Sequence, residues 1–122
     1  MPALAHFQVF NTLSHSRATL ERSAQVAEGM ALAQCADGTG YWIATDQFKD
    51  RSLFHVFDRQ DLAYRGAFAG EKTANTDGVW LHQAGTARFP AGVFYAVHDD
   101  MGVAAFDWRD VAKALELPEN CE

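Results

Sequence analysis

Short apolar segments, bounded by glycine, aspartate and other turn-forming residues, recur along the chain and predict β-strands. Each segment is rich in aromatic or β-branched side chains, which favour a pleated and half-buried surface. Phe54 and Val56 share one face of their segment, and Phe57 lies on the other face beside His55, so we expect a sheet packed on both sides. The predicted strands are residues 6–11, 29–34, 41–46, 53–59, 63–69, 78–83 and 92–98.

Polar turn residues separate the predicted strands. Asp37-Gly38 is a two-residue signal for a tight hairpin, and residues 59–61 form a short polar link. Residues 70–77 form a longer polar loop. The middle of the chain therefore predicts a series of antiparallel strands that follow one another through short connections.

One segment, residues 107–117, has the spacing of a helix. Asp107 can cap its N-terminus, Asp110 falls in the first turn, and Pro118 follows the last turn. We expect the apolar face of this helix to dock on a sheet. That face consists of Trp108, Val111, Ala112 and Leu115.

The spacing of the strands limits the fold class. Short antiparallel strands at intervals of about 10–12 residues are typical of sandwiches, barrels and propeller blades. The chain has 122 residues, which is enough for one core and, at about 45 residues per blade, for two to three blades. A closed propeller needs at least about four blades, so a propeller built from this chain alone would be incomplete.

Charge narrows the partners that the chain can bind. Ten Lys and Arg against sixteen Asp and Glu give a formal charge of -6 without a basic cluster, which argues against nucleic acid. A divalent cation is the usual bridge between an acidic protein and an anionic substrate. No apolar run approaches the roughly 20 residues that cross a bilayer. The first residues lack the features of a secretory signal, so we expect a cytoplasmic protein, a mature form or a fragment.

Several common catalytic and redox arrangements are absent. Cys35 and Cys121 are too few for a disulfide framework and form no C-x-x-C motif, so unpaired thiols are favoured while a mutual disulfide stays open. H-E-x-x-H, G-x-S-x-G and P-loop motifs are missing, and Tyr41 stands where a cysteine phosphatase would need arginine after Cys35. The histidines have no ligand spacing, and we expect surface or packed side chains at His6, His15, His55, His82 and His98.

Oxygen-bearing side chains near the ends of the predicted strands are the remaining candidates for a functional site. If the loops share one rim of a β-architecture, their carboxylate and amide groups form the hard-oxygen donor set that calcium prefers. The alternative is that they are solvated turn residues. The candidates are Glu28, Asp46, Gln47, Glu71, Asp77, Asp99 and Asp100.

Glu28, Asp46, Gln47 and Asp77 lie in segments that resemble the C-terminal part of the β-propeller phytases, which are calcium-dependent enzymes that release phosphate from phytate. The resemblance covers about residues 26–113, with the segments in the order and spacing of that family. The segments are E-G-M at 28–30, G-Y-W-I-A-T-D-Q at 40–47, V-F-D-R-Q at 56–60, Y-R-G-A-F at 64–68, T-D-G-V at 76–79, F-P-A-G-V-F at 89–94 and W-R-D-V-A at 108–112.

The resemblance implies an all-β fold. Residues 1–122 would be a single segment of a six-bladed propeller, with two to three blades of antiparallel strands and one short C-terminal helix. It also implies a 3-phytase-type phosphatase, extracellular or periplasmic, that hydrolyses phytate by attack of a calcium-held water on phosphorus. Glu28 would be catalytic and a calcium ligand, Asp77 a second ligand, Glu71 a supporting carboxylate on a longer arm, and Gln47 a catalytic-site residue.

This chain departs from the family pattern at several positions. Val26 and Asn75 stand where the family has aspartate, and residues 102–106 replace a lysine-bearing segment. The family's remaining ligands and phosphate-binding lysine and arginine come from earlier blades. Two alternatives therefore stay open: a non-catalytic fragment that self-associates or pairs with a partner chain through exposed blade edges, and a different propeller-type hydrolase or sugar-acid-binding module.

Overall fold

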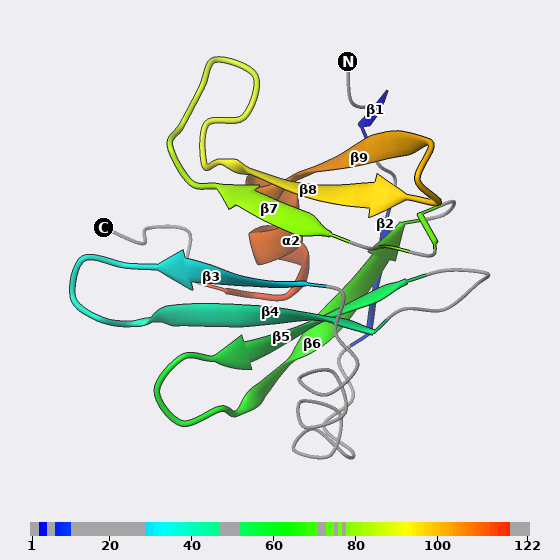
Figure 1. The fold of residues 1–122 in the computed structure, drawn as a ribbon. Coiled ribbons are helices and arrows are strands. Elements are labelled where there is room, and N and C mark those ends of the chain that lie inside the picture. The colour runs from blue at the N-terminus through cyan, green and yellow to red at the C-terminus, as the bar shows by residue number, and fades with distance from the viewer. Residues whose placement is uncertain are drawn as a thin grey trace.

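A computed structural model describes the backbone of residues 3–4 and 7–10, and residues 29–46, 52–70, 73–74, 76 and 78–117 in full. This part of the chain is mostly β, with two sheets and one short helix near the C-terminus (Figure 1). The expected mostly-β architecture with a C-terminal helix is confirmed. A propeller is not identified among the described residues.

The larger sheet has five strands in the order β2-β6-β5-β4-β3, and every neighbouring pair is antiparallel. Strands β3 to β6 follow one another in sequence as a meander, and the N-terminal strand β2 adds to the outer edge beside β6. Each strand lies within two residues of a predicted segment at either end. The strands are β2 Phe7–Phe10, β3 Met30–Gln34, β4 Gly40–Asp46, β5 Leu53–Asp58 and β6 Tyr64–Gly70.

The smaller sheet has four strands in the order β1-β9-β8-β7. Its β7-β8-β9 part is an antiparallel meander, whereas β1 pairs with β9 in parallel, which departs from the all-antiparallel expectation. Strands β1 and β9 were not predicted. The strands are β1 Ala3–Leu4, β7 Val79–His82, β8 Val93–His98 and β9 Gly102–Asp107.

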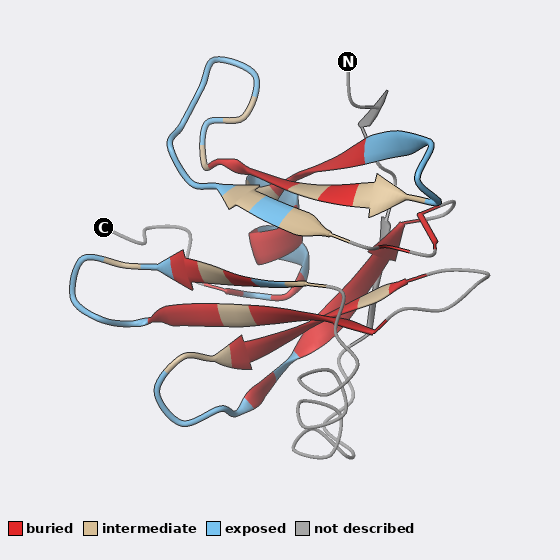
Figure 2. Ribbon diagram, viewed as in Figure 1, coloured by how far each residue is buried: buried red, intermediate tan, exposed pale blue. Residues whose placement is uncertain are grey.

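The main core lies between the two sheets and is built around four phenylalanines. Phe54 and Phe68 extend from the five-stranded sheet, and Phe94 and Phe106 from the four-stranded sheet; none is exposed. Their ring centroids lie 5.1–6.0 Å apart. Most of strands β4, β5 and β6 is buried (Figure 2). A second cluster around Phe57 lies on the opposite face of the larger sheet, which confirms that this sheet is packed on both sides.

Helix α2, Trp108–Ala114, follows β9 directly. The carboxylate of Asp107 accepts a hydrogen bond from the Arg109 backbone N–H at 3.0 Å, so the predicted N-cap is confirmed. The helix is shorter than expected: Leu115 caps it, and Glu116 has a left-handed φ of 58°. The predicted apolar face packs into the main core with Val111, Ala112, Leu115 and Trp108. No helix in the described residues is long and apolar enough to span a membrane.

The edge strands β3 and β7 are joined by a side chain at one end and by close packing at the other. The side-chain amide of Gln83 accepts from the Gln34 backbone N–H at 3.1 Å and donates to its carbonyl at 2.9 Å. At the other end, a Cβ added to Gly29 would meet Val79 Cγ2 at 3.1 Å. The two meanders therefore start from neighbouring edges.

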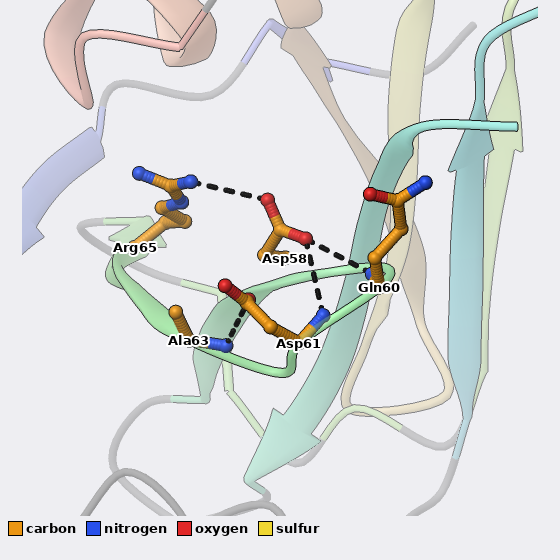
Figure 3. Close-up of polar contacts among 5 residues, drawn as sticks. All are labelled: Asp58, Gln60, Asp61, Ala63 and Arg65. Atoms are coloured by element: carbon orange, nitrogen blue, oxygen red, sulfur yellow. Dashed lines mark hydrogen bonds and ion pairs between the residues drawn. The ribbon is translucent and has the colours of Figure 1, made fainter. Parts of the chain in front are cut away.

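The turn between β5 and β6 is organised by one carboxylate (Figure 3). Asp58 Oδ1 accepts from the backbone N–H groups of Gln60 at 2.9 Å and Asp61 at 3.4 Å, and Asp58 Oδ2 accepts from Arg65 at 3.1 Å. Partial burial acts to raise the pKa of Asp58, but these hydrogen bonds and the Arg65 charge outweigh it and lower the pKa below its ordinary value. The V-F-D-R-Q and Y-R-G-A-F segments thus include residues that shape a turn.

We expect Asp58→Ala to lower the free energy of unfolding at pH 7 by about 1–2 kcal/mol, since the turn loses its acceptor. The pKa of Asp58 is lower in the folded than in the unfolded chain. The stabilisation is therefore present above the unfolded value of about 3.9 and lost as pH falls through the folded value. Denaturant unfolding of both proteins between pH 7 and pH 3 measures this. A difference that stays constant with pH would contradict the role of the charge.

Candidate functional site

The four residues predicted to form the site, Glu28, Gln47, Glu71 and Asp77, lie outside the described residues. Each adjoins a described residue, and these neighbours stand where strands begin or end. Gly29 precedes β3, Asp46 ends β4, Gly70 ends β6 and Gly78 precedes β7. The strand pairing places these four termini at one end of the two sheets, on the right in Figure 1.

Direct contacts connect the strand termini at this end. The Gly29 carbonyl accepts from the Thr45 backbone N–H at 3.3 Å, which ties the start of β3 to the end of β4. Gly29 also packs against the start of β7, because an added Cβ would lie 3.2 Å from the Val79 backbone nitrogen and 3.6 Å from Gly78 Cα. The sequence neighbours of Glu28, Gln47 and Asp77 are thus brought together.

The connection from β6 to β7 is fastened to both sheets at the same end. Ser52, just before β5, donates its backbone N–H to the Thr73 carbonyl at 2.9 Å, and its hydroxyl accepts from the Thr76 N–H at 3.2 Å. His98, which ends β8, accepts from the Ala74 N–H at Nδ1 at 3.0 Å. We call this end the rim and define it as Gly29, Thr45, Asp46, Ser52, Gly70, Thr73, Ala74, Thr76, Gly78, His98, Asp99 and Asp100.

A buried polar cluster lies where β4, β5 and β6 pair, next to the rim. His55 Nε2 lies 3.4 Å from Asp46 Oδ2, and His55 Nδ1 lies 3.1 Å from the Tyr64 hydroxyl. All three residues are buried, and burial raises the pKa of the Tyr64 hydroxyl. Asp46 is therefore a buried side chain packed beside His55, which corrects the alternative that it is a solvated turn residue.

The remaining histidines and loop carboxylates that the sequence singled out differ in burial and in hydrogen bonding. His55 and His98 are packed and hydrogen-bonded, and His82 is exposed, as expected; His6 and His15 lie outside the described residues. Asp99 and Asp100 form the exposed β8-β9 turn, with left-handed φ angles of 49° and 56°.

The donor atoms of the rim are mainly oxygens, which suits a hard cation such as calcium. Thr45 and Thr76 are fully buried, and their hydroxyls have no hydrogen-bond partner among the described residues. Among those residues, no group of three or more His, Cys, Asp or Glu side chains could hold a metal ion. The described residues of the rim therefore show no metal site, and the predicted carboxylates Glu28, Glu71 and Asp77 lie outside the part of the chain that the structure describes.

Sequence reasoning missed several residues of the rim. Ser52 and Thr73 lie in no quoted segment, and Thr76 was noted only as the first residue of T-D-G-V. Their contacts involve backbone groups that meet only after the sheets form. His98 could have been noticed as the last residue of a predicted strand before an Asp-Asp turn, but its partner Ala74 has no distinguishing chemistry.

Cys35 lies at the end of the molecule opposite the rim. Cys35 follows β3 and is disulfide-bonded, so the expectation of unpaired thiols is wrong. The other cysteine of the sequence, Cys121, lies outside the described residues. Spacing alone carried no information on this bond, because pairing depends on where the fold places each thiol.

No protein-family model, curated protein or solved structure matches the chain.

Proposed function

We propose that this chain is part of a calcium-dependent phosphomonoesterase of the β-propeller phytase type, acting on phytate. One observation carries the proposal: the sequence neighbours of all four candidate residues lie at one rim of the two sheets. The neighbours are Gly29, Asp46, Gly70 and Gly78. These neighbours, from Gly29 to Gly78, span 49 positions of the 122-residue sequence and yet lie together, as a shared metal and substrate site requires.

The two sheets are proposed to be two adjacent blades of a six-bladed propeller. In a propeller, each blade is a meander that runs outward from an inner strand. Here β3-β4-β5-β6 and β7-β8-β9 run outward from β3 and β7. Gln83 and Gly29 connect those two starting strands at their opposite ends. This arrangement supports the blade interpretation.

In the proposed site, Glu28 and Asp77 bind calcium, Glu71 supports them, and Gln47 orients a phosphate group or the attacking water. Phytate is a dense polyanion and the chain carries a formal charge of -6, so the substrate needs a cationic bridge. When bound, calcium neutralises phosphate charge and activates water for in-line attack on phosphorus, without a covalent enzyme intermediate. Lysine and arginine side chains from further blades would complete substrate binding.

An extracellular or periplasmic location is part of the proposal. The disulfide at Cys35 supports it, because disulfides persist mainly in oxidising compartments. The acidic chain has no basic cluster for nucleic acid.

The first test is thermal unfolding with calcium and with a chelator. A ligand that binds only the folded state adds about 2.7 kcal/mol at a concentration of a hundred times its Kd, so a clear upward shift of Tm is expected. Glu28→Gln should keep the fold and lose most of the shift, because one anionic ligand is removed at constant volume. Glu116→Gln, an equal charge change at an exposed position after α2, is the matched control and should keep the shift.

Phosphate release from phytate in the presence of calcium tests the activity itself. A calcium shift without phosphate release would favour a different propeller-type hydrolase or a sugar-acid-binding module. A cooperative transition that calcium does not move would contradict the metal site and the proposed function with it.

One observation favours the alternative of a non-catalytic module that associates with itself or a partner chain. The outer face of the four-stranded sheet bears apolar side chains: Trp80 is 68% exposed and Val103 41%. Tyr95 pairs with Trp80 across the strands, so both lie on this face. Exposed apolar sheet faces commonly mark interfaces. Concentration-dependent mass in sedimentation, lost in Trp80→Ser, together with no phosphate release would support this alternative.

A further inference from the structure

We propose that Gln83 makes an autoinhibitory contact: its side chain occupies the edge of β3 and prevents a second copy of this chain from adding a strand there. The contact lies at the end of the molecule opposite the rim. It therefore goes beyond the proposed function and does not depend on calcium.

The backbone polar groups of Gln34 face away from the five-stranded sheet. Where β3 pairs with β4, the Cys35 N–H donates to the Thr39 carbonyl at 2.9 Å, and the Gly29 carbonyl accepts from the Thr45 N–H at 3.3 Å. Hydrogen-bonded positions alternate along an antiparallel strand, so positions 29 and 35 bond toward β4 and Gln34 bonds outward. Strand β3 ends its sheet, and no backbone ladder joins it to β7 among the described residues. Gln34 therefore presents an N–H and a carbonyl at the edge of the sheet.

The Gln83 side chain binds Gln34 as a residue of a neighbouring strand would. Its Oε1 accepts from the Gln34 N–H at 3.1 Å, and its Nε2 donates to the Gln34 carbonyl at 2.9 Å. Opposing residues of an antiparallel pair exchange the same two hydrogen bonds, and a carboxamide carries both the acceptor and the donor for them. Gln83 follows β7, so the blocking group comes from the other sheet (Figure 1). One side chain thus takes the place of a partner strand at this position.

Strand β3 has little protection of its own against edge-to-edge pairing. Edge strands usually avoid such pairing through charged side chains, proline or a bulge, but the sequence M-A-L-A-Q has neither charge nor proline, and β3 pairs with β4 residue for residue. Strand β7 covers the start of β3, where an added Cβ on Gly29 would meet Val79 Cγ2 at 3.1 Å. The end at Gln34 is therefore the part that needs a block. Because the chain has a formal charge of -6, two copies can approach without like-charge repulsion at this neutral strand, so the expected partner is β3 of a second copy.

The test measures amide hydrogen exchange and self-association of Gln83→Ala. Alanine frees the backbone groups of Gln34, so exchange at the Gln34 amide in dilute protein should quicken about two- to tenfold, the factor that corresponds to one ordinary hydrogen bond. As the protein concentration rises, the mass in sedimentation should increase toward that of a dimer. Exchange at Gln34 should then slow again, because its N–H pairs with the added strand. Gln60→Ala is the matched control, since Gln60 is exposed in the β5-β6 turn, and it should behave as the original protein in both measurements.

Gln83→Lys separates the hydrogen bond from its consequence. Lysine cannot accept from the Gln34 N–H, so exchange should quicken as in Gln83→Ala, but its charge opposes strand addition and the protein should gain no mass over the original. Unchanged exchange in both variants would show that Gln83 does not hold Gln34. Faster exchange without a gain of mass in Gln83→Ala would overturn the blocking role. A gain of mass that leaves exchange at Gln34 fast would assign the association to another surface and overturn that role as well.

Discussion

Phe68→Ala is expected to lower the free energy of unfolding by about 3–5 kcal/mol, the range for removing a large buried aromatic side chain. Phe68 has no exposed surface. Its ring lies 5.2 Å from Phe54 in its own sheet, 5.4 Å from Phe94 and 5.3 Å from Phe106 in the other sheet, and 6.5 Å from Trp108 of the helix. One truncation therefore removes contacts between both sheets and α2.

Denaturant unfolding monitored by circular dichroism measures this effect. Trp80→Ala is the control, since it truncates an equally bulky side chain that is 68% exposed, and it should change the free energy of unfolding by less than about 1 kcal/mol. Domains of this size have a total stability of about 5–15 kcal/mol, so Phe68→Ala should remove a large fraction of it. Similar small effects of both substitutions would show that the phenylalanine layer does not join the sheets.

Gly40→Ala is expected to be nearly as damaging for a steric reason. An added Cβ would lie 1.9 Å from the Ala33 carbonyl oxygen and 3.0 Å from its carbon, on the neighbouring strand β3. Gly40 also has a φ of +141°, a conformation that favours glycine. The clash requires β3 and β4 to separate, so we expect a loss of about 3–5 kcal/mol from overpacking and backbone strain together.

Substitutions at two other glycines allow the cost of the steric clash to be measured separately from the cost of backbone strain. Gly38 has a φ of +88° but nothing within 4 Å of an added Cβ, so Gly38→Ala should cost only the strain, about 1–2 kcal/mol. Gly102 has neither a left-handed φ nor a neighbour within 4 Å, and Gly102→Ala should be nearly neutral. Thermal unfolding of the three variants should rank them in that order. A Gly40→Ala protein as stable as Gly38→Ala would refute the close approach of the strands.

Local pattern was sufficient to predict seven of the nine strands found in the described residues, and the helix. Residues 53–58 place Phe54 and Val56 on one face and Phe57 on the other, and both faces are buried; this signal does not depend on distant residues. Asp107 caps the helix, and Asp37-Gly38 lies in the turn between β3 and β4, as expected. Segment boundaries and turns were therefore readable before any pairing was known.

Features that depend on distant residues could not be predicted. Strand β1 has only two residues and exists because β9 lies beside it. Strand β9 combines Gly102 with two alanines, so its strand character was weak without its partner. The sequence positions of Asp46 and His55 do not show that the two side chains meet, because this contact depends on the register of β4 against β5. In that register Ala44 lies opposite His55, and Asp46 lies opposite Leu53.

The candidate site stays a prediction, because Glu28, Gln47, Glu71 and Asp77 lie outside the described residues. The sequence indicated oxygen donors in loops at strand ends, and the pairing of the strands brings those ends to one rim. Ser52 and His98 were beyond sequence reasoning, because they bind backbone groups of Thr73, Ala74 and Thr76 that any residue type would provide.

The N-terminal strands have a consequence for the order of folding. Strand β1 pairs with β9 through Ala3 and Ala104, and β2 pairs with β6 through Phe7 and Gly70. During synthesis the first residues must therefore wait for partners made much later, and the parallel β1-β9 pair can form only when nearly all of this sequence has emerged. The β3-β6 meander, whose partners are close in sequence, can form earlier. We therefore expect the pairing of β1 with β9 and of β2 with β6 to be late and slow, because contacts between residues far apart in sequence form slowly.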